Sequence, residues 1–62
     1  MLRITAKELF SNNCPYNKIK INGKPYWKHS PGLWVYDGQA RPGEYDSAPE
    51  VSDPENVGCI YG

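Results

Sequence analysis

YNKIKINGKPYWKHSPGLWVYDG, residues 16–38, is the stretch that decides the fold of this chain. Lysine and isoleucine alternate up to residue 21, which is the period of a half-buried strand. Asn22-Gly23 follows, and this dipeptide favours a two-residue hairpin turn that sets the register of both strands. The predicted cross-strand pairs are Lys18–Trp27, Ile19–Tyr26, Lys20–Pro25 and Ile21–Lys24.

A third strand is predicted at residues 33–36, Leu-Trp-Val-Tyr, because bulky aliphatic and aromatic residues favour strands. The preceding residues 29–32, His-Ser-Pro-Gly, are interpreted as a four-residue connection built around proline and glycine. That loop length sets the second register. The predicted pairs are Trp27–Trp34, Tyr26–Val35 and Pro25–Tyr36.

This register divides the sheet into two unlike faces, because directly opposite side chains share a face. An apolar face, expected to form the core, contains Ile19, Ile21, Tyr26, Leu33 and Val35. The other face alternates lysines with large rings and contains Lys18, Lys20, Trp27, Trp34 and Tyr36. Asp37-Gly38 indicates another tight turn. A fourth strand at residues 39–41 would then place Arg41 opposite Trp34.

A short helix is predicted near the N-terminus. Residues 5–8, Thr-Ala-Lys-Glu, match a capping box, and Ile4 and Leu9 have the spacing of a hydrophobic staple. Residues 11–13, Ser-Asn-Asn, are predicted to end the helix, and Cys14-Pro15 shows that it cannot continue, since proline breaks a helix. So short a helix needs tertiary packing to persist. We therefore expect it to cover the apolar face.

The C-terminal third is acidic, contains Pro49 and Pro54, and has no strand or helix period. Asp53 and Pro54 suit the cap and first position of a single helical turn. We predict one α+β domain over residues 1–62. Residues 1–43 form the short helix packed on a three- to four-stranded antiparallel β-meander, and residues 44–62 form an irregular acidic wrap or tail.

Charge is unevenly distributed although the net charge is zero. Residues 1–36 contain six of the seven basic residues and one of the seven acidic residues. Either the two parts neutralise each other, or each presents a charged surface to a different partner. A neutral chain gains little from non-specific attraction to nucleic acid.

The sequence contains no apolar run that suits a signal peptide or a membrane span. We predict a cytoplasmic protein without a membrane partner, in which Cys14 and Cys59 stay reduced. A disulfide between these cysteines is the alternative. Two cysteines and one histidine are too few for a four-ligand zinc site unless a carboxylate joins them. No metal or cofactor is predicted.

An enzyme is not predicted, since no phosphate-binding glycine pattern, nucleophile elbow or metal-ligand cluster is present in the sequence. His29 is interpreted as a solvated turn residue rather than as the base for a cysteine nucleophile. Glu44 and Asp46, two residues apart in a loop, are interpreted as surface acids.

The lysine and aromatic face has three interpretations: cover by the acidic third, a protein partner, or single-stranded nucleic acid stacked on the rings. We predict a small non-enzymatic binding or regulatory protein, by analogy with viral or accessory modulators of larger proteins. The alternative is a single-strand nucleic-acid-binding module, and a second copy of the chain is a further candidate partner. The predicted contact residues are Lys18, Lys20, Trp27, Trp34, Tyr36 and Arg41, with Glu44, Asp46 and Glu50 as acidic contacts.

Overall fold

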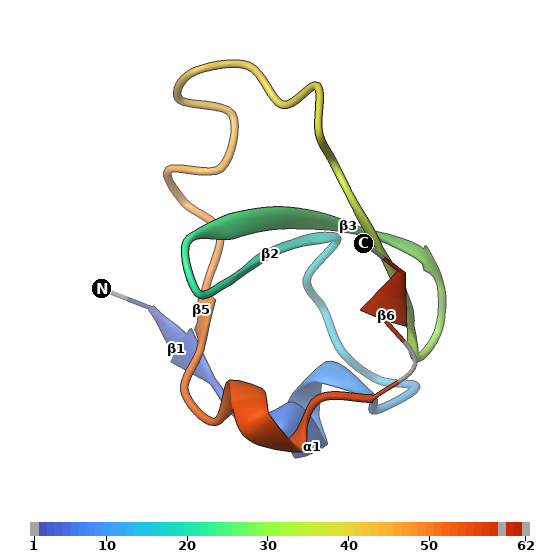
Figure 1. The fold of residues 1–62 in the computed structure, drawn as a ribbon. Helices are drawn as coiled ribbons and strands as arrows, with labels where there is room; N and C mark the ends of the chain where they lie inside the picture. The colour runs from blue at the N-terminus through green and yellow to red at the C-terminus, as the bar shows by residue number, and fades with distance from the viewer. Residues whose placement is uncertain (1, 59, 62) are drawn as a thin grey trace.

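The computed structural model describes residues 2–58, 60 and 61 (Figure 1). Within these residues six strands form one mixed sheet in the order β1-β5-β2-β3-β4-β6. A single helical turn, α1, lies between β1 and β2 in the chain, and a 3-10 turn, η1, lies between β5 and β6. The bounds are β1 Arg3–Ile4, α1 Ala6–Leu9, β2 Lys18–Ile21, β3 Lys24–Ser30, β4 Leu33–Tyr36, β5 Glu50–Val51, η1 Pro54–Asn56 and β6 Ile60–Tyr61.

The predicted fold class, a helix packed on an antiparallel meander with an irregular C-terminal segment, is therefore wrong. α1 has only four residues, and the C-terminal third supplies two strands. β5 lies between β1 and β2 and is parallel to both, while β6 is parallel to β4. Both strands are two residues long, which is too short for alternation to be visible in the sequence.

The β2–β3 hairpin has the predicted register. Lys18, Ile19, Lys20 and Ile21 lie opposite Trp27, Tyr26, Pro25 and Lys24. Asn22 and Gly23 have φ angles of 54° and 80°. Two successive positive φ angles match the right-handed twist of the flanking strands, which is why this dipeptide fixes the pairing.

The predicted β3–β4 register is wrong by one residue. β3 continues to Ser30, which pairs with Leu33, and His29 is an extra residue that forms a β-bulge between two bonded pairs. Only Pro31 and Gly32 remain in the turn, where Gly32 has a φ of 79°. The observed pairs are Tyr26–Tyr36, Trp27–Val35 and Lys28–Trp34.

This shift moves Trp34 from the predicted exposed face into the core, because a one-residue slip exchanges the two faces of a strand. The Trp34 side chain is 0% exposed, and its Nε1–H donates to the Leu9 carbonyl at 3.1 Å. The Lys28 ammonium lies 5.5 Å from the ring centroid and donates to the Cys14 carbonyl at 2.8 Å. Burial of the larger ring favours the observed register.

The core lies between the sheet and the α1 segment. Its buried members are Ile4, Leu9, Cys14, Ile19, Ile21, Tyr26, Trp34 and Val51. The predicted cap of α1 is confirmed, since the Thr5 hydroxyl accepts from the Glu8 amide at 3.2 Å. Asp53 Oδ1 also accepts from the Ala6 amide at 2.7 Å. The C-terminal third thus satisfies a donor in the first turn of α1.

Residues 37–49, which we call the strap, connect β4 to β5 as the long yellow-to-orange loop of Figure 1. The predicted fourth strand at residues 39–41 is wrong, because Gln39 lies in a turn and Ala40 and Arg41 belong to no strand. The Asp37 amide donates to the Pro25 carbonyl and the Lys20 amide donates to the Pro49 carbonyl, so both ends are tied to the sheet. The strap lies on the opposite side of the β2–β3 hairpin from α1 (Figure 1).

Candidate functional site

The outer face of the sheet, on the side away from the core, carries one row of side chains across four strands. Register places Lys18 opposite Trp27, Trp27 opposite Val35, and Val35 opposite Tyr61. Trp27 is 38% exposed and Tyr61 is 63% exposed. We call Trp27, Val35 and Tyr61 the aromatic row.

The aromatic row has apolar and aromatic neighbours. The His29 ring lies beside Trp27, with 5.8 Å between ring centroids and an interplanar angle of 40°. Leu33 precedes Val35 by two positions on β4 and therefore shares its face. Both Leu33 and Val35 are half-buried. This part of the outer face is a mainly apolar surface open to solvent.

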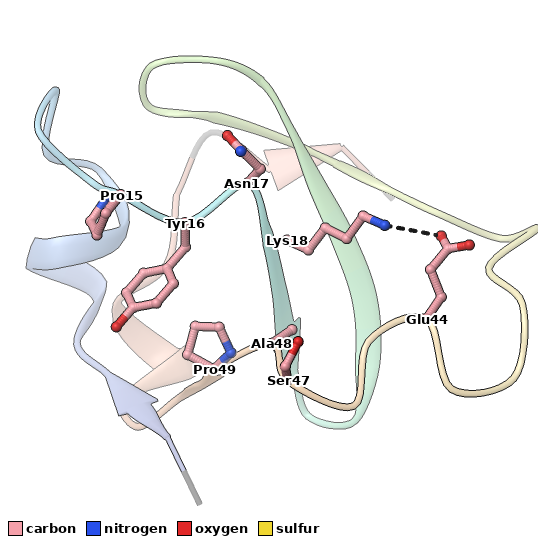
Figure 2. A pocket seen from close by; sticks show the side chains of 8 residues that line it. All are labelled: Pro15, Tyr16, Asn17, Lys18, Glu44, Ser47, Ala48 and Pro49. Atoms are coloured by element: carbon pink, nitrogen blue, oxygen red, sulfur yellow. Dashed lines mark ion pairs between the residues drawn. The ribbon is translucent and has the colours of Figure 1, made fainter.

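The strap covers the other part of the outer face. Tyr45 at its centre is only 7% exposed, and its hydroxyl donates to Asp37 Oδ2 at 2.9 Å. The Lys18 ammonium lies 5.3 Å from the Tyr45 ring centroid and 3.6 Å from Glu44 Oε1 (Figure 2). Lys18 thus contacts a ring and a carboxylate that are adjacent in sequence.

Two open hollows flank the strap. The first, about 340 Å³, lies at the start of β2 between Tyr16, Pro49 and the Lys18–Glu44 pair (Figure 2). The second, about 190 Å³, lies near the β2–β3 turn, where Lys20 and Pro25 face Arg41 and Asp46. The strap therefore crosses the sheet without filling the space on either side of Tyr45.

Burial raises the pKa of the Tyr45 phenol, and its hydrogen bond to Asp37 and the carboxylate charges of Asp37 and Glu44 raise it further. A phenolate would be desolvated and would lie beside two negative charges. The neutral hydroxyl is therefore the form that holds the strap.

Tyr45 makes the stability of the strap sensitive to alkaline pH. Because the folded pKa lies above the unfolded value of about 10, its contribution is complete below pH 10 and is lost progressively as pH rises above that value. In a spectrophotometric titration, Tyr45→Phe should remove the step at highest pH. The same variant should lower the free energy of unfolding by about 1 kcal/mol at neutral pH. An unchanged titration would show that Tyr45 is not the most shielded phenol.

The predicted basic and aromatic contact residues do not all lie on the same face of the sheet. Lys18, Lys20 and Trp27 share the outer face as predicted. The placement of Trp34 and Tyr36 there is wrong, because both follow the shifted register to the core side, where Tyr36 packs edge-on against Tyr26 at 5.6 Å between centroids. Arg41 does not lie opposite Trp34 and instead lines the second hollow.

The predicted acidic contacts lie against the chain itself. Glu44 pairs with Lys18, and Asp46 lines the second hollow. Glu50 belongs to β5, and its Oε1 accepts from the Gly23 amide at 3.2 Å. Cover of the outer face by the acidic third, one of the three interpretations, is met only in part. Glu44 and Tyr45 contact Lys18, whose side chain stays 46% exposed, and Trp27 is 38% exposed.

Sequence reasoning missed Tyr45, Val35 and Tyr61. Val35 was assigned to the core face because the bulge at His29 leaves no mark in the residue pattern. Tyr61 belongs to a strand too short to show a period, and Tyr45 lies between two acids in a loop. Only contacts between distant segments bring Tyr45 beside Lys18 and Tyr61 beside Val35.

Among residues 2–58, 60 and 61, no group of three or more His, Cys, Asp or Glu could hold a metal ion. No helix in this part is long and apolar enough to span a membrane. Cys14 is buried, while the alternative of a disulfide involves Cys59, which lies outside the described residues.

No protein-family model matches the chain, and neither do any curated proteins or solved structures. The outer face of the sheet is therefore the feature from which a function can be inferred.

Proposed function

We propose that this chain is a small, non-enzymatic cytoplasmic protein that acts by binding a larger protein through the aromatic row. The observation that carries the proposal is the register of three strands, β3, β4 and β6, which aligns exposed Trp27 and Tyr61 on either side of Val35. Tryptophan and tyrosine are enriched among the residues that dominate the energetics of protein interfaces.

The spacing of the row suits an apolar side chain of a partner. Neighbouring strands lie about 4.8 Å apart, so the backbones that carry Trp27 and Tyr61 are roughly 10 Å apart. Val35, on the strand between them, is smaller than either ring and half-buried. The row therefore has two raised rings and a lower aliphatic centre, against which a partner's aliphatic or proline side chain can pack.

The charges around the row support a protein partner over single-stranded nucleic acid. A nucleic-acid platform needs free cations beside the stacking rings to follow the phosphates. Lys18, next to Trp27, is paired with Glu44. Lys28 is directed toward the core side, where it donates to the Cys14 carbonyl. The acidic strap adjoins the same face and would repel a phosphate backbone.

Pull-down from the producing cell tests this proposal. The full chain carrying Trp27→Ser and Tyr61→Ser should lose a partner that the parent chain retains, because both rings of the row are removed. Tyr36→Ser is the matched control, since Tyr36 is also an exposed tyrosine but follows the core side of β4. Melting curves for each variant report whether the fold is intact.

Two results would contradict the proposal. Retention of the partner by the double variant, with loss by Tyr36→Ser, would place the contact elsewhere. The nucleic-acid alternative would be favoured if the chain bound single-stranded oligonucleotides with an affinity that falls steeply between roughly 50 and 200 mM salt. Such a fall is expected when several phosphate contacts are made.

A further inference from the structure

The strap is attached to the sheet in two different ways. Its ends are fixed by backbone hydrogen bonds from Asp37 to Pro25 and from Lys20 to Pro49. Between these ends, the backbone bonds of the described residues are local turns within the strap, such as the Ala48 amide to the Tyr45 carbonyl. Side-chain contacts of Glu44 and Tyr45 hold the centre. The centre can therefore leave the sheet without breaking a strand pair.

The contacts of the centre resemble those of a bound peptide. Glu44 and Tyr45 present a carboxylate and a ring side by side, and the Lys18 ammonium contacts both. An ammonium is attracted to a carboxylate by charge and to the face of an aromatic ring by its quadrupole. The outer face around Lys18 is thus complementary to an acidic residue followed by an aromatic residue.

We propose that Glu44 and Tyr45 occupy a second binding site, and that an acidic–aromatic segment of the partner takes their place. This inference rests on the proposed function and deepens it, because it names the chemistry of the partner segment. Lys18 lies directly beside Trp27 in the same row. Displacement of the strap therefore joins the Lys18 site to the aromatic row as one continuous surface.

Tethering makes the strap an autoinhibitory segment. A covalently linked segment acts at an effective concentration on the order of millimolar. An external segment with the same contacts binds only to the fraction of molecules in which the strap is displaced, so its apparent affinity is lowered by that fraction. A true partner overcomes this competition by also contacting the aromatic row.

The test uses a synthetic peptide with the sequence of residues 41–47, RPGEYDS, added to the full chain. Backbone amide NMR spectra follow binding at Lys18 and report folding of each variant. Tyr45→Ala vacates the site, so the peptide should bind this variant at least about tenfold more tightly than the parent chain. Glu44→Gln, which removes only the ion pair, should give a smaller gain in the same direction.

Two matched controls define the site. Lys18→Gln, added to Tyr45→Ala, should abolish the gain, and a peptide with alanine in place of its tyrosine should not bind. The inference would be overturned if the peptide bound the parent chain, Tyr45→Ala and Glu44→Gln with equal affinity. It would also be overturned if the gain in peptide affinity survived Lys18→Gln. If Tyr45→Ala does not fold, the peptide affinity of Glu44→Gln is compared with that of the parent chain, and equal values refute the inference.

The two proposals fail separately. The double variant of Trp27 and Tyr61 could lose the cellular partner while Tyr45→Ala and Glu44→Gln bind the peptide no more tightly than the parent. That result would support the aromatic row as the partner site and refute the strap site. Peptide binding at Lys18 with a partner indifferent to Trp27 and Tyr61 would refute the proposed function.

Discussion

Trp34→Ala is expected to leave the chain at the limit of folding. Removal of a fully buried tryptophan costs about 3–5 kcal/mol of stability. The Leu9 carbonyl also loses the indole donor that reaches it at 3.1 Å. A domain of this size has a free energy of unfolding of roughly 3–9 kcal/mol in total. Urea denaturation followed by circular dichroism should show a weak or absent cooperative transition.

Trp27→Ala is the matched control, because both substitutions remove an indole from the β3–β4 hairpin. Trp27 lies on the outer face and is 38% exposed, so its loss should lower the free energy of unfolding by no more than about 1 kcal/mol. The register predicted from sequence places both rings on one face and implies similar costs. Equal losses would therefore contradict the bulge at His29.

Removal of residues 44–62 is expected to abolish the folded state. β5 lies between β1 and β2, so its loss leaves β1 without a neighbouring strand. Val51 is lost from the core, and the Ala6 amide loses its acceptor on Asp53. The truncated chain should show poor amide dispersion in NMR spectra and no cooperative melting.

A full-length chain with Glu44→Gln, Asp46→Asn and Glu55→Gln separates strand pairing from charge neutralisation. Surface ion pairs and surface substitutions each contribute less than about 1 kcal/mol. This control should therefore keep a cooperative transition. A truncated chain that melts at the temperature of the parent would show that β5 and β6 contribute nothing to the fold.

The positions that sequence reasoning placed correctly depend on neighbours along the chain. Asn22 and Gly23 adopt the positive φ angles of a two-residue turn, and that turn alone sets the pairing of Lys18 with Trp27. The Thr5 hydroxyl reaches the Glu8 amide within a single turn. Pro54 begins η1, with Asp53 at its cap position, as predicted.

The positions that were wrong depend on segments far apart in the sequence. The bulge at His29 slips β4 by one residue, and burial of the Trp34 ring against α1 stabilises that slip. Two-residue strands such as β5 exist only because neighbouring strands supply their hydrogen-bond partners. Neither effect has a local signature, so the candidate site could be assembled only in part.

The sequence by itself determined the first hairpin, its register, and the placement of Lys18, Lys20 and Trp27 on one face. Tertiary structure decided which tryptophan is buried and which segments complete the sheet. It also decided that Tyr45 contacts Lys18 and that Tyr61 lies in the same row as Trp27. The physical reason is the range of the interactions: turn geometry is fixed within a few residues, whereas the choice of face is decided by how much apolar area the whole chain buries.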